Sequence, residues 1–298
     1  MQQNRLGKSD LYVSEISFGC MSLGSDMAVN EAITGKAMDA GINLFDTADL
    51  YNQSENERML GKLLKGRRRQ AIIATKAGNQ WRSDGSGWDW NPRKEYILKA
   101  ADESLRRLQT DYIDLYQLHG GTINDPMDDT IEAFERLKEQ GKIRWYGISS
   151  IRPNVIAEYL RRSSIVSVMM QYSLLDRRPE ESCLALLQQH EVSVLARGSV
   201  AKGLLAGKPA AAYNGYEEQA VAAAAKAIGQ LAVQLERSAA QTAAGYVLQQ
   251  PVATAVLGIR TLQQLNDMVD GKGVAALSAA QKETLQHAVK PVFYTEHR

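Results

Sequence analysis

Residues 112–150 have the sequence YIDLYQLHGGTINDPMDDTIEAFERLKEQGKIRWYGISS, in which two apolar, β-rich runs enclose a segment with helical spacing. The runs span 112–120 and 143–150, and the helical segment spans 128–140. Two strands joined by a crossover helix pair in parallel, because a parallel connection needs a dozen or more residues. Near-continuous apolar runs also indicate strands that are buried on both faces. This stretch therefore predicts a βαβ unit.

The same alternation continues on both sides of this unit. Strands are expected over 13–20, 43–48, 71–78, 112–120, 143–150, 167–173, 192–200 and 252–259. Helices are expected over 30–41, 54–66, 93–108, 128–140, 154–162, 180–190, 238–250 and 261–271. About eight such units, with no Pro/Gly/Ser-rich linker between them, favour one closed barrel over an open sheet. We predict an α/β fold, a (β/α)8 TIM barrel that residues 1–298 form as a single domain.

Three segments stand outside the repeat. The first dozen residues are expected to form a hairpin over the bottom of the barrel, and the segments 217–237 and 278–290 are expected to be extra helices. Capping-box spacing marks three helix starts: Ser54 with Glu57, Ser238 with Gln241, and the start of 278–290. Glycines stand where helix C-caps are expected: Gly41, Gly66 and Gly141.

Composition excludes several classes of partner. The net charge is +1, so no overall field favours nucleic acid or an anionic membrane. No apolar run approaches the roughly 18 residues of a membrane span. The basic run 67–69 is expected to complement a helix C-terminus. Cys20 and Cys183 have neither metal-ligand spacing nor a disulfide pattern, and the N-terminus lacks the apolar core of a signal peptide. We therefore expect a cytoplasmic protein without a metal.

Ionisable residues follow consecutive predicted strands. Asp46 ends the second strand and Tyr51 follows it, Lys76 ends the third strand, and His119 ends the fourth. Each residue alone is more often a cap, a packing group or a satisfied core side chain. In a parallel barrel, however, the C-terminal strand ends form one rim, where active sites lie. Their coincidence on neighbouring strands therefore indicates a catalytic site.

These four side chains suit proton transfer to a carbonyl. Tyrosine has a reference pKa near 10, and an ammonium such as that of Lys76 favours the phenolate and lowers that pKa. Asp46 would keep Lys76 charged and oriented, and His119 would donate a hydrogen bond to the same substrate oxygen. No protein side chain supplies hydride, so a nicotinamide cofactor is implied.

With these motifs the chain resembles the aldo-keto reductase superfamily, and within it the bacterial branch that contains relatives of the potassium-channel β subunit. The matching stretches occur in the family's order between residues 3 and 270: NLFDTADLYNQSENERMLGKLLKG, AIIATKAG, DYIDLYQLHG, GKIRWYGISS, QYSLLDRR, LARGSVAKGLLAGK and LGIRTLQQL. The resemblance implies a (β/α)8 barrel that binds NADPH/NADP+ in an extended pose. The absence of a GxGxxG motif after a strand agrees with a site that is not of the Rossmann type.

The resemblance also implies roles for individual residues. Tyr51 would be the general acid, Lys76 and Asp46 would tune it, and His119 would orient the carbonyl. The expected contacts to the nicotinamide half are Gly19, Cys20, Met21, Asp46, Ser149 and Gln171. Where the family often has Asn after that serine, this chain has Ser150.

The rest of the expected cofactor site also follows from the resemblance. The family usually stacks Tyr or Trp on the nicotinamide, whereas this chain has Arg197, whose charge should favour the neutral reduced ring over the oxidised cation. The expected pyrophosphate clasp lies in 198–208: Gly198, Ser199, Val200, Ala201, Lys202, Gly203 and Lys208. The alternative for this stretch is a flexible, solvated loop. The expected adenosine contacts are Gly258, Arg260, Gln264 and Asp267, with Arg260 on the 2′-phosphate and Met268 replacing a family Asn.

Substrates of the family are aldehydes and ketones, and the loops after the strands shape their pocket. The loop after the third strand holds Trp81, Trp88 and Trp90 together with Arg82, and it is expected to form an aromatic wall in which Trp81 and Trp88 contact the substrate. Alternatively these tryptophans pack on one another or on a second subunit, which leaves a homo-oligomer possible. The loop after the fourth strand is short and indicates an open pocket.

Two other functions stay open at this point. The first is an NADPH-binding regulatory or redox-sensing subunit with slow turnover, for which Cys20 would be the conceivable thiol. The second is a metal-dependent hydrolase that uses Asp46, His119 and Asp49, although the chain lacks a clustered His pair.

Overall fold

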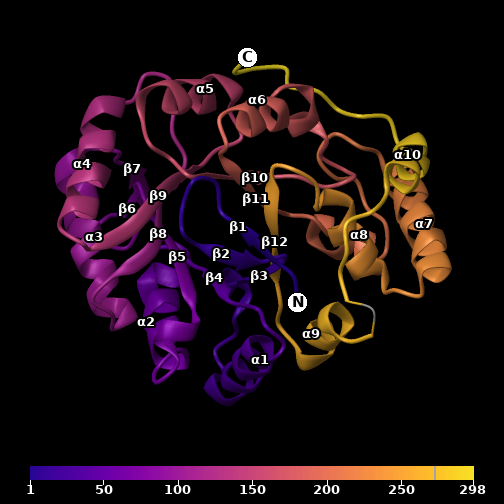
Figure 1. The fold of residues 1–298 in the computed structure, drawn as a ribbon, viewed down its shortest axis with the longest axis horizontal. Coiled ribbons are helices and arrows are strands. Elements are labelled where there is room, and N and C mark those ends of the chain that lie inside the picture. The colour runs from indigo at the N-terminus through magenta and orange to yellow at the C-terminus, as the bar shows by residue number, and fades with distance from the viewer. Residues whose placement is uncertain (272) are drawn as a thin grey trace.

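Eight parallel strands close into a barrel in the computed structural model, which describes residues 1–271 and 273–298 (Figure 1). Around the barrel the strands follow the order β3, β4, β5, β8, β9, β10, β11, β12 and back to β3. Their bounds are β3 Ile16–Gly19, β4 Leu44–Asp46, β5 Ile72–Ala77, β8 Ile113–Leu118, β9 Ile143–Ser149, β10 Ser167–Gln171, β11 Ser193–Arg197 and β12 Val252–Gly258. Each strand lies inside its expected range, so the predicted barrel is confirmed.

Helices surround the barrel, as Figure 1 shows. Their bounds are α1 Met27–Asp39, α2 Glu55–Leu63, α3 Lys94–Leu108, α4 Met127–Glu139, α5 Pro153–Arg162, α6 Cys183–Gln189, α7 Glu218–Leu235, α8 Ala239–Val247, α9 Leu262–Val269 and α10 Ala279–His287. The expected extra helices are α7 and α10. The first helix begins three residues earlier than predicted, because the side chain of Asp26 accepts a hydrogen bond from the backbone of Val29 and caps it.

Two of the three predicted capping boxes exist. The side chains of Ser238 and Ser278 each accept from the N3 backbone, and the N3 glutamine returns the bond. The prediction for Ser54 with Glu57 is wrong. Ser54 has a left-handed backbone, with φ 70°, and its hydroxyl bonds the carbonyl of Asp49 instead. Of the three glycines expected at helix C-caps, Gly41 and Gly141 directly follow the C-caps of α1 and α4 with φ 92° and 71°, and Gly66, two residues after the C-cap of α2, has φ 79°.

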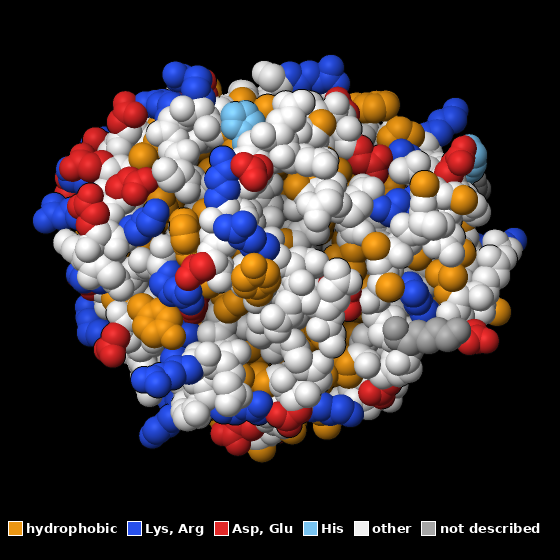
Figure 2. Space-filling model, viewed as in Figure 1, with side chains coloured by type: hydrophobic (Ala, Val, Ile, Leu, Met, Phe, Trp, Pro, Cys, Tyr) orange, Lys and Arg blue, Asp and Glu red, His pale blue; other side chains and the backbone are white. Residues whose placement is uncertain are grey.

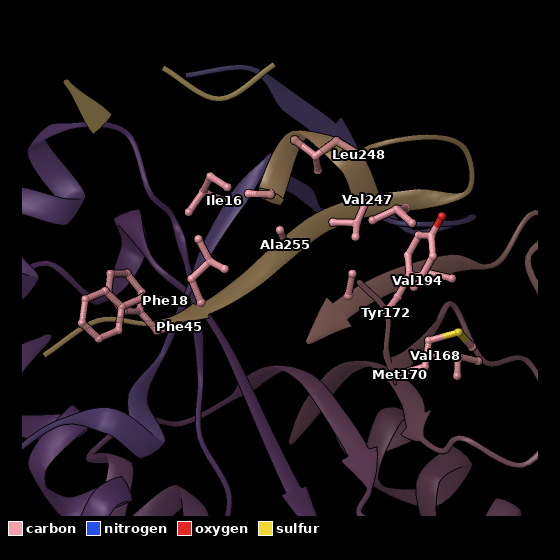
Figure 3. Packing of buried hydrophobic residues seen from close by; sticks show 14 of the residues in the cluster. Ile16, Phe18, Phe45, Val168, Met170, Tyr172, Val194, Val247, Leu248 and Ala255 are labelled. Atoms are coloured by element: carbon pink, nitrogen blue, oxygen red, sulfur yellow. The ribbon is translucent and has the colours of Figure 1, made fainter. Parts of the chain in front are cut away.

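The apolar core has two parts, because alternate strand residues face opposite sides of the barrel wall. Leu44, Ala74, Leu115 and Leu195 belong to the cluster inside the barrel. Their neighbours in the strands face the helices, and Figure 3 shows that layer. There the rings of Phe18 and Phe45 stack with centroids 5.7 Å apart.

The N-terminal hairpin closes the bottom of the barrel, as predicted. It consists of β1 Gln3–Arg5 and β2 Tyr12–Ser14, which pair antiparallel. Three of its residues, Leu6, Leu11 and Val13, join the cluster inside the barrel. The side chain of Asn4 bonds the carbonyl of Ala253, at the start of β12. The opposite mouth is therefore the open one.

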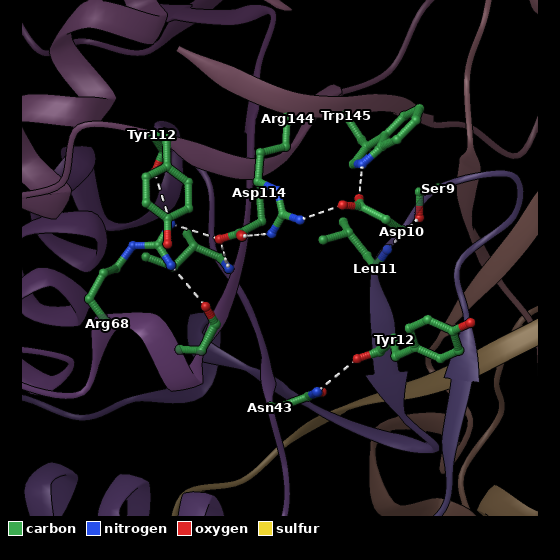
Figure 4. A network of polar contacts seen from close by, with 12 residues as sticks. Ser9, Asp10, Leu11, Tyr12, Asn43, Arg68, Tyr112, Asp114, Arg144 and Trp145 are labelled. Carbon is green, nitrogen blue, oxygen red and sulfur yellow. Dashed lines mark hydrogen bonds and ion pairs between the residues drawn. The ribbon is translucent and has the colours of Figure 1, made fainter. Parts of the chain in front are cut away.

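A polar network holds the hairpin in place (Figure 4). Buried Asp114 accepts from Arg68 at 2.7 Å and from Arg144 at 3.1 Å. The second guanidinium nitrogen of Arg144 reaches Asp10 in the hairpin at 2.9 Å. Asp10 also accepts from the indole of Trp145 at 2.6 Å, which lowers the pKa of this carboxyl. Asp114 therefore anchors the arginines that connect the hairpin to the barrel wall.

A second hairpin follows β5 and was not predicted. It consists of β6 Asn79–Trp81 and β7 Trp88–Trp90. The indole of Trp90 covers Gly78, where an added Cβ would come within 2.6 Å of the ring. Its Nε1 donates to both carboxylate oxygens of Asp125 at 3.1 Å. Trp90 thus connects this hairpin to the barrel through its contacts with Gly78 and Asp125.

The charges on the surface and the apolar character of the helices are relevant to binding of nucleic acid and membranes. Figure 2 shows acidic and basic side chains intermixed over the face it draws. None of the helices in residues 1–271 and 273–298 combines the length and the apolar character that a bilayer crossing needs.

We expect Asp114→Ala to lower the free energy of unfolding by about 3 kcal/mol, because it leaves two guanidinium groups without their buried partner. Asp10→Ala is the matched control. Its carboxylate is 66% exposed, so the same deletion should cost about 1 kcal/mol or less. Urea unfolding followed by circular dichroism measures both. Equal losses in the two variants would contradict the anchoring role of Asp114.

Candidate active site

Four polar side chains meet at the open mouth of the barrel. Asp46 is the last residue of β4, Lys76 lies near the end of β5, and His119 directly follows β8. These three strands are neighbours, and Lys76 is paired with Gln117 in the register of β5 and β8. Tyr51 begins the short 3-10 helix η2 Tyr51–Ser54 after β4. The four residues predicted from the strand ends are therefore brought together.

Lys76 is the centre of the group, and its side chain is completely buried. Its Nζ donates to Asp46 Oδ1 at 2.6 Å, to the carbonyl of Thr47 at 2.8 Å and to the hydroxyl oxygen of Tyr51 at 3.3 Å. An ammonium has three protons, so these acceptors satisfy all of them. Burial alone lowers the pKa of Lys76, but Asp46 and Tyr51 outweigh burial and raise it. Lys76 is therefore an ammonium at neutral pH.

Tyr51 lies in a sharply bent loop. The three residues after it have positive φ angles, 49° at Asn52, 50° at Gln53 and 70° at Ser54. The loop is held by the bond from Ser54 Oγ to the carbonyl of Asp49 and by the indole of Trp81, which donates to the carbonyl of Leu50 at 3.1 Å. This bending is the reason why no capping box forms at Ser54.

The pKa of Tyr51 is shifted in the direction opposite to the prediction. Burial of the phenol raises its pKa above the ordinary value, and the positive charge of Lys76 opposes that rise without cancelling it. The prediction of a net lowering is therefore wrong for the chain by itself. The tyrosine is protonated at neutral pH, while Lys76 still lowers the cost of forming the phenolate.

His119 faces Tyr51 across the mouth. Their ring centroids are 5.6 Å apart, and the planes are nearly perpendicular at 83°. Burial lowers the pKa of His119 to about 3, and the charges of Lys76 and Arg197 add to the effect. Its buried Nδ1 has no hydrogen-bond partner among the residues that the structure describes. His119 is thus a neutral imidazole with an unused polar atom at the site.

A cavity of about 450 Å³ opens over these residues. Tyr51, His119 and Arg197 line it, together with Met21, Gly120, Gly121, Ser149, Ser150, Ile151, Arg152 and Met169. Trp81 and Trp88, expected as an aromatic wall, are not among the residues that line this cavity in the described part of the chain. They face each other across the β6–β7 hairpin, and Trp88 is 48% exposed.

Most expected nicotinamide contacts lie at the same rim. Gly19 ends β3, and the side chain of Met21 just after it is exposed. Ser149 ends β9 and Gln171 ends β10. Arg197, at the end of β11, donates to Gln171 Oε1 at 3.2 Å. Sequence reasoning missed Tyr213, whose hydroxyl accepts from Gln171 Nε2 at 3.3 Å, because its loop has no motif.

Cys20 lies at the rim, but its thiol is completely buried. Burial first, and then the charge of Asp46, raise the pKa of this thiol well above its ordinary value. Cys183 is also buried, and both cysteines are free. A buried protonated thiol is a poor redox sensor, so nothing at Cys20 favours the sensing alternative.

The predicted pyrophosphate clasp is an ordered turn instead of a flexible loop. It contains the 3-10 helix η5 Ala201–Ala206, preceded by Gly198 with φ 74°. Ser199 and Ala201 are buried, and Val200 is partly buried. The side chain of Lys208 lies over Gly203, where an added Cβ would come within 2.9 Å of it. The backbone of Gly203 has φ 94°, a conformation that favours glycine.

Of the expected adenosine residues, Arg260 lines a second cavity of about 290 Å³. The backbone of Arg260 donates to Gln264 Oε1 at 2.8 Å, and Gly258 packs against Ser22. Asp267 is exposed, whereas Met268 is buried and offers no polar group.

The two cavities share Met21 in their linings. They extend from Tyr51 and His119 at one end to Arg260 at the other. His119, whose buried Nδ1 has no hydrogen-bond partner within residues 1–271 and 273–298, lies at one end of this path. Arg260, whose guanidinium has no ion-pair partner within the same ranges, lies at the other end. An extended dinucleotide fits this shape and these groups.

The family profile of aldo/keto reductases matches residues 15–290. The chain belongs to this family. It is similar to the oxidoreductase YqkF of Bacillus subtilis (strain 168), with 47% identity over 308 aligned positions that cover all of both chains. A solved structure, aldo-keto reductase AKR11C1 from Bacillus halodurans in its holo form, is 50% identical with a TM-score of 0.94. That similarity covers 100% of this chain and 99% of the other.

A more distant relative is the NADH-specific methylglyoxal reductase of Escherichia coli (strain K12), which is 31% identical over 227 residues. The match covers 70% of each chain. As an aldo-keto reductase, the chain is an oxidoreductase that works with a nicotinamide cofactor on small carbonyl compounds.

The hydrolase alternative has no support at the site. Within residues 1–271 and 273–298, no group of three or more His, Cys, Asp or Glu side chains is arranged to hold a metal ion. Asp46 is already paired with the ammonium of Lys76, and Asp49 bonds Tyr96 behind the mouth. A cation at Asp46 would be repelled by Lys76.

Proposed function

We propose that the chain is an NADPH-dependent reductase of aldehydes and ketones, in which Tyr51 donates the proton to the carbonyl oxygen. The observation that carries the proposal is the buried ammonium of Lys76, which lies 2.6 Å from Asp46 and 3.3 Å from the hydroxyl of Tyr51. A positive charge held there stabilises a phenolate, which is the product of proton donation.

The nicotinamide, when bound, supplies hydride to the carbonyl carbon. The protein side chains handle the developing negative charge on the oxygen. Tyr51 gives its proton to that oxygen, and Lys76 stabilises the phenolate left behind. Asp46 keeps the ammonium oriented, and the neutral ring of His119 offers a hydrogen bond that orients the carbonyl.

The protonation states at rest agree with these roles. Burial raises the pKa of Tyr51, so the phenol keeps its proton until a carbonyl arrives. The lowered pKa of His119 makes its imidazole neutral near pH 7. A neutral ring donates a hydrogen bond without competing with Tyr51 as the proton source.

One feature supports NADPH over NADH, and two others support a reduced nicotinamide dinucleotide in general. Arg260 is exposed at the far cavity, and its side chain has no ion-pair partner among the described residues, so its fork is free for a 2′-phosphate. The turn at 198–208 offers lysine charge and close backbone approach to a pyrophosphate. Arg197 bears a positive charge at the nicotinamide position, which favours the neutral reduced ring. One relative is named NADH-specific, so membership of the family does not decide between NADPH and NADH. The proposed preference for NADPH therefore depends on the residues of this chain.

The shape of the cavity supports a permissive substrate range. Gly120 and Gly121 form part of its wall, and the loop between β8 and α4 adds no bulky side chain there. Small aldehydes and α-dicarbonyls would enter without rearrangement. We therefore expect methylglyoxal and 4-nitrobenzaldehyde to be useful first substrates.

Tyr51→Phe should reduce kcat by about 10² to 10⁴-fold, the usual contribution of a general acid, while the affinity for NADPH stays unchanged. NADPH absorbance during reduction of 4-nitrobenzaldehyde measures turnover, and fluorescence titration measures cofactor binding. Near-normal turnover in this variant would contradict the role of Tyr51. Tight NADPH binding without turnover in the unmodified protein would support the regulatory alternative.

Arg260→Gln should weaken NADPH binding by about 10 to 100-fold, because a charge-assisted hydrogen bond contributes about 1.5 to 3 kcal/mol. Binding of NADH, which lacks the 2′-phosphate, should change little. Arg161→Gln, on the exposed side of α5, is the control. Equal weakening of both cofactors by Arg260→Gln would refute the assignment to the 2′-phosphate.

A further inference from the structure

A buried carboxyl behind the mouth has no part in the reaction described so far. Asp49 is only 5% exposed, and its Oδ2 lies within hydrogen-bond distance, 2.8 Å, of the hydroxyl oxygen of Tyr96. Its Oδ1 is buried and has no hydrogen-bond partner in the described part of the chain. Its backbone nitrogen donates to the carbonyl of Lys76 at 3.1 Å, and its carbonyl accepts from Ser54 Oγ at 2.7 Å. Asp49 is therefore built into the loop that carries Tyr51.

Tyr96 connects this loop to a different part of the barrel. Its hydroxyl on α3 also lies 3.4 Å from the carbonyl of Asn79, at the start of β6. The side chain of Asn79 in turn donates to the carbonyl of His119 at 3.1 Å. A continuous chain of polar contacts thus runs from the Tyr51 loop to the strand end that carries His119.

We propose that Asp49 is a positioning residue that, through Tyr96 and Asn79, fixes the loop carrying Tyr51 relative to the strand end carrying His119. The proposal rests on the proposed roles of Tyr51 and His119 as proton donor and orienting group. Both groups must reach the same carbonyl oxygen, and a misplacement of about 1 Å can cost about 100-fold in rate. The Tyr51 loop needs such support, because three successive residues in it have positive φ angles.

Titratable groups from several elements surround Asp49 and its partner Tyr96. They are Glu57 on α2, Glu103 and Arg107 on α3, and Tyr116 on β8. Burial, and then the charge of Glu57, raise the pKa of Asp49 to about 7, against the opposing effects of Tyr96 and Arg107. Asp49 consequently exists in both protonation states near neutral pH.

The two states arrange the polar chain differently, because Tyr96 has only one hydroxyl proton. A protonated Asp49 donates to the oxygen of Tyr96, whose own proton is then free for the carbonyl of Asn79. An ionised Asp49 accepts a hydrogen bond from the hydroxyl of Tyr96, so that hydroxyl no longer has a proton to donate to the carbonyl of Asn79. The connection between the two catalytic segments is complete only while Asp49 is neutral.

The direct test is Tyr96→Phe, which deletes the bridging hydroxyl and leaves the ring in place. We expect kcat/KM for 4-nitrobenzaldehyde to fall about 10 to 100-fold with NADPH affinity unchanged. Tyr246→Phe is the matched control. Its hydroxyl on α8 also donates to a carboxylate, that of Glu180, at 2.8 Å, but it has no contact with the Tyr51 loop. A similar loss in both variants would overturn the proposal.

Asp49→Asn separates positioning from simple structural support. An asparagine can donate to Tyr96 as a neutral carboxyl does, so we expect kcat/KM close to that of the unmodified enzyme at pH 6. As pH rises through 7, the unmodified enzyme should lose activity through ionisation of Asp49, whereas Asp49→Asn should not. A fall of the same size in both proteins between pH 6 and 8 would count against Asp49.

A readout that is independent of turnover completes the test. The chain has four histidines, and the ring resonance of His119 is identified by its absence in His119→Gln. We expect this resonance to shift in Tyr96→Phe but not in Tyr246→Phe. An unmoved resonance overturns the positioning proposal even if Tyr51→Phe abolishes turnover. A shifted resonance in a protein that reduces no carbonyl compound supports the positioning proposal and refutes the proposed function alone.

Discussion

The site depends on a charge that is taken completely out of water. Placing an ammonium inside a protein costs several kcal/mol unless every proton finds an acceptor. Lys76 meets this condition with a carboxylate, a backbone carbonyl and a phenol, supplied by Asp46, Thr47 and Tyr51. The same three bonds that stabilise the buried charge also place it beside the phenol. The stability of the pair and the proposed chemistry of the tyrosine are therefore consequences of one interaction.

The barrel makes this interaction possible, because its neighbouring parallel strands end at one rim. That part of the structure was predictable from the sequence. Continuous apolar runs separated by helical segments placed all eight strands, and Asp46, Lys76 and His119 could be assigned to one mouth from their positions at the strand ends. The hairpin at the bottom was also predicted, but the buried carboxyl of Asp114 that anchors it was not, since a single acid within a strand has no local signature.

What the sequence did not predict depends on tertiary contacts. The spacing of Ser54 and Glu57 fits a capping box, yet Glu57 is buried and bonds Arg107 and Thr75, and Ser54 turns back to Asp49. The tryptophans of the loop after β5 suggested a substrate wall, but that loop folds into a hairpin whose Trp90 packs on Gly78. The net rise in the pKa of Tyr51 was missed because burial, which the sequence does not reveal, exceeds the effect of Lys76.

The most direct test of the account is the pH dependence of single-turnover NADPH oxidation in Lys76→Met, measured by stopped flow with saturating 4-nitrobenzaldehyde. Methionine matches the length of the side chain but removes its charge. The account predicts a rate reduced by about 100-fold or more, with the titration of the proton donor moved to higher pH, because the charge that favours the phenolate is gone. A rate near that of the unmodified protein, with an unshifted pH profile, would contradict it.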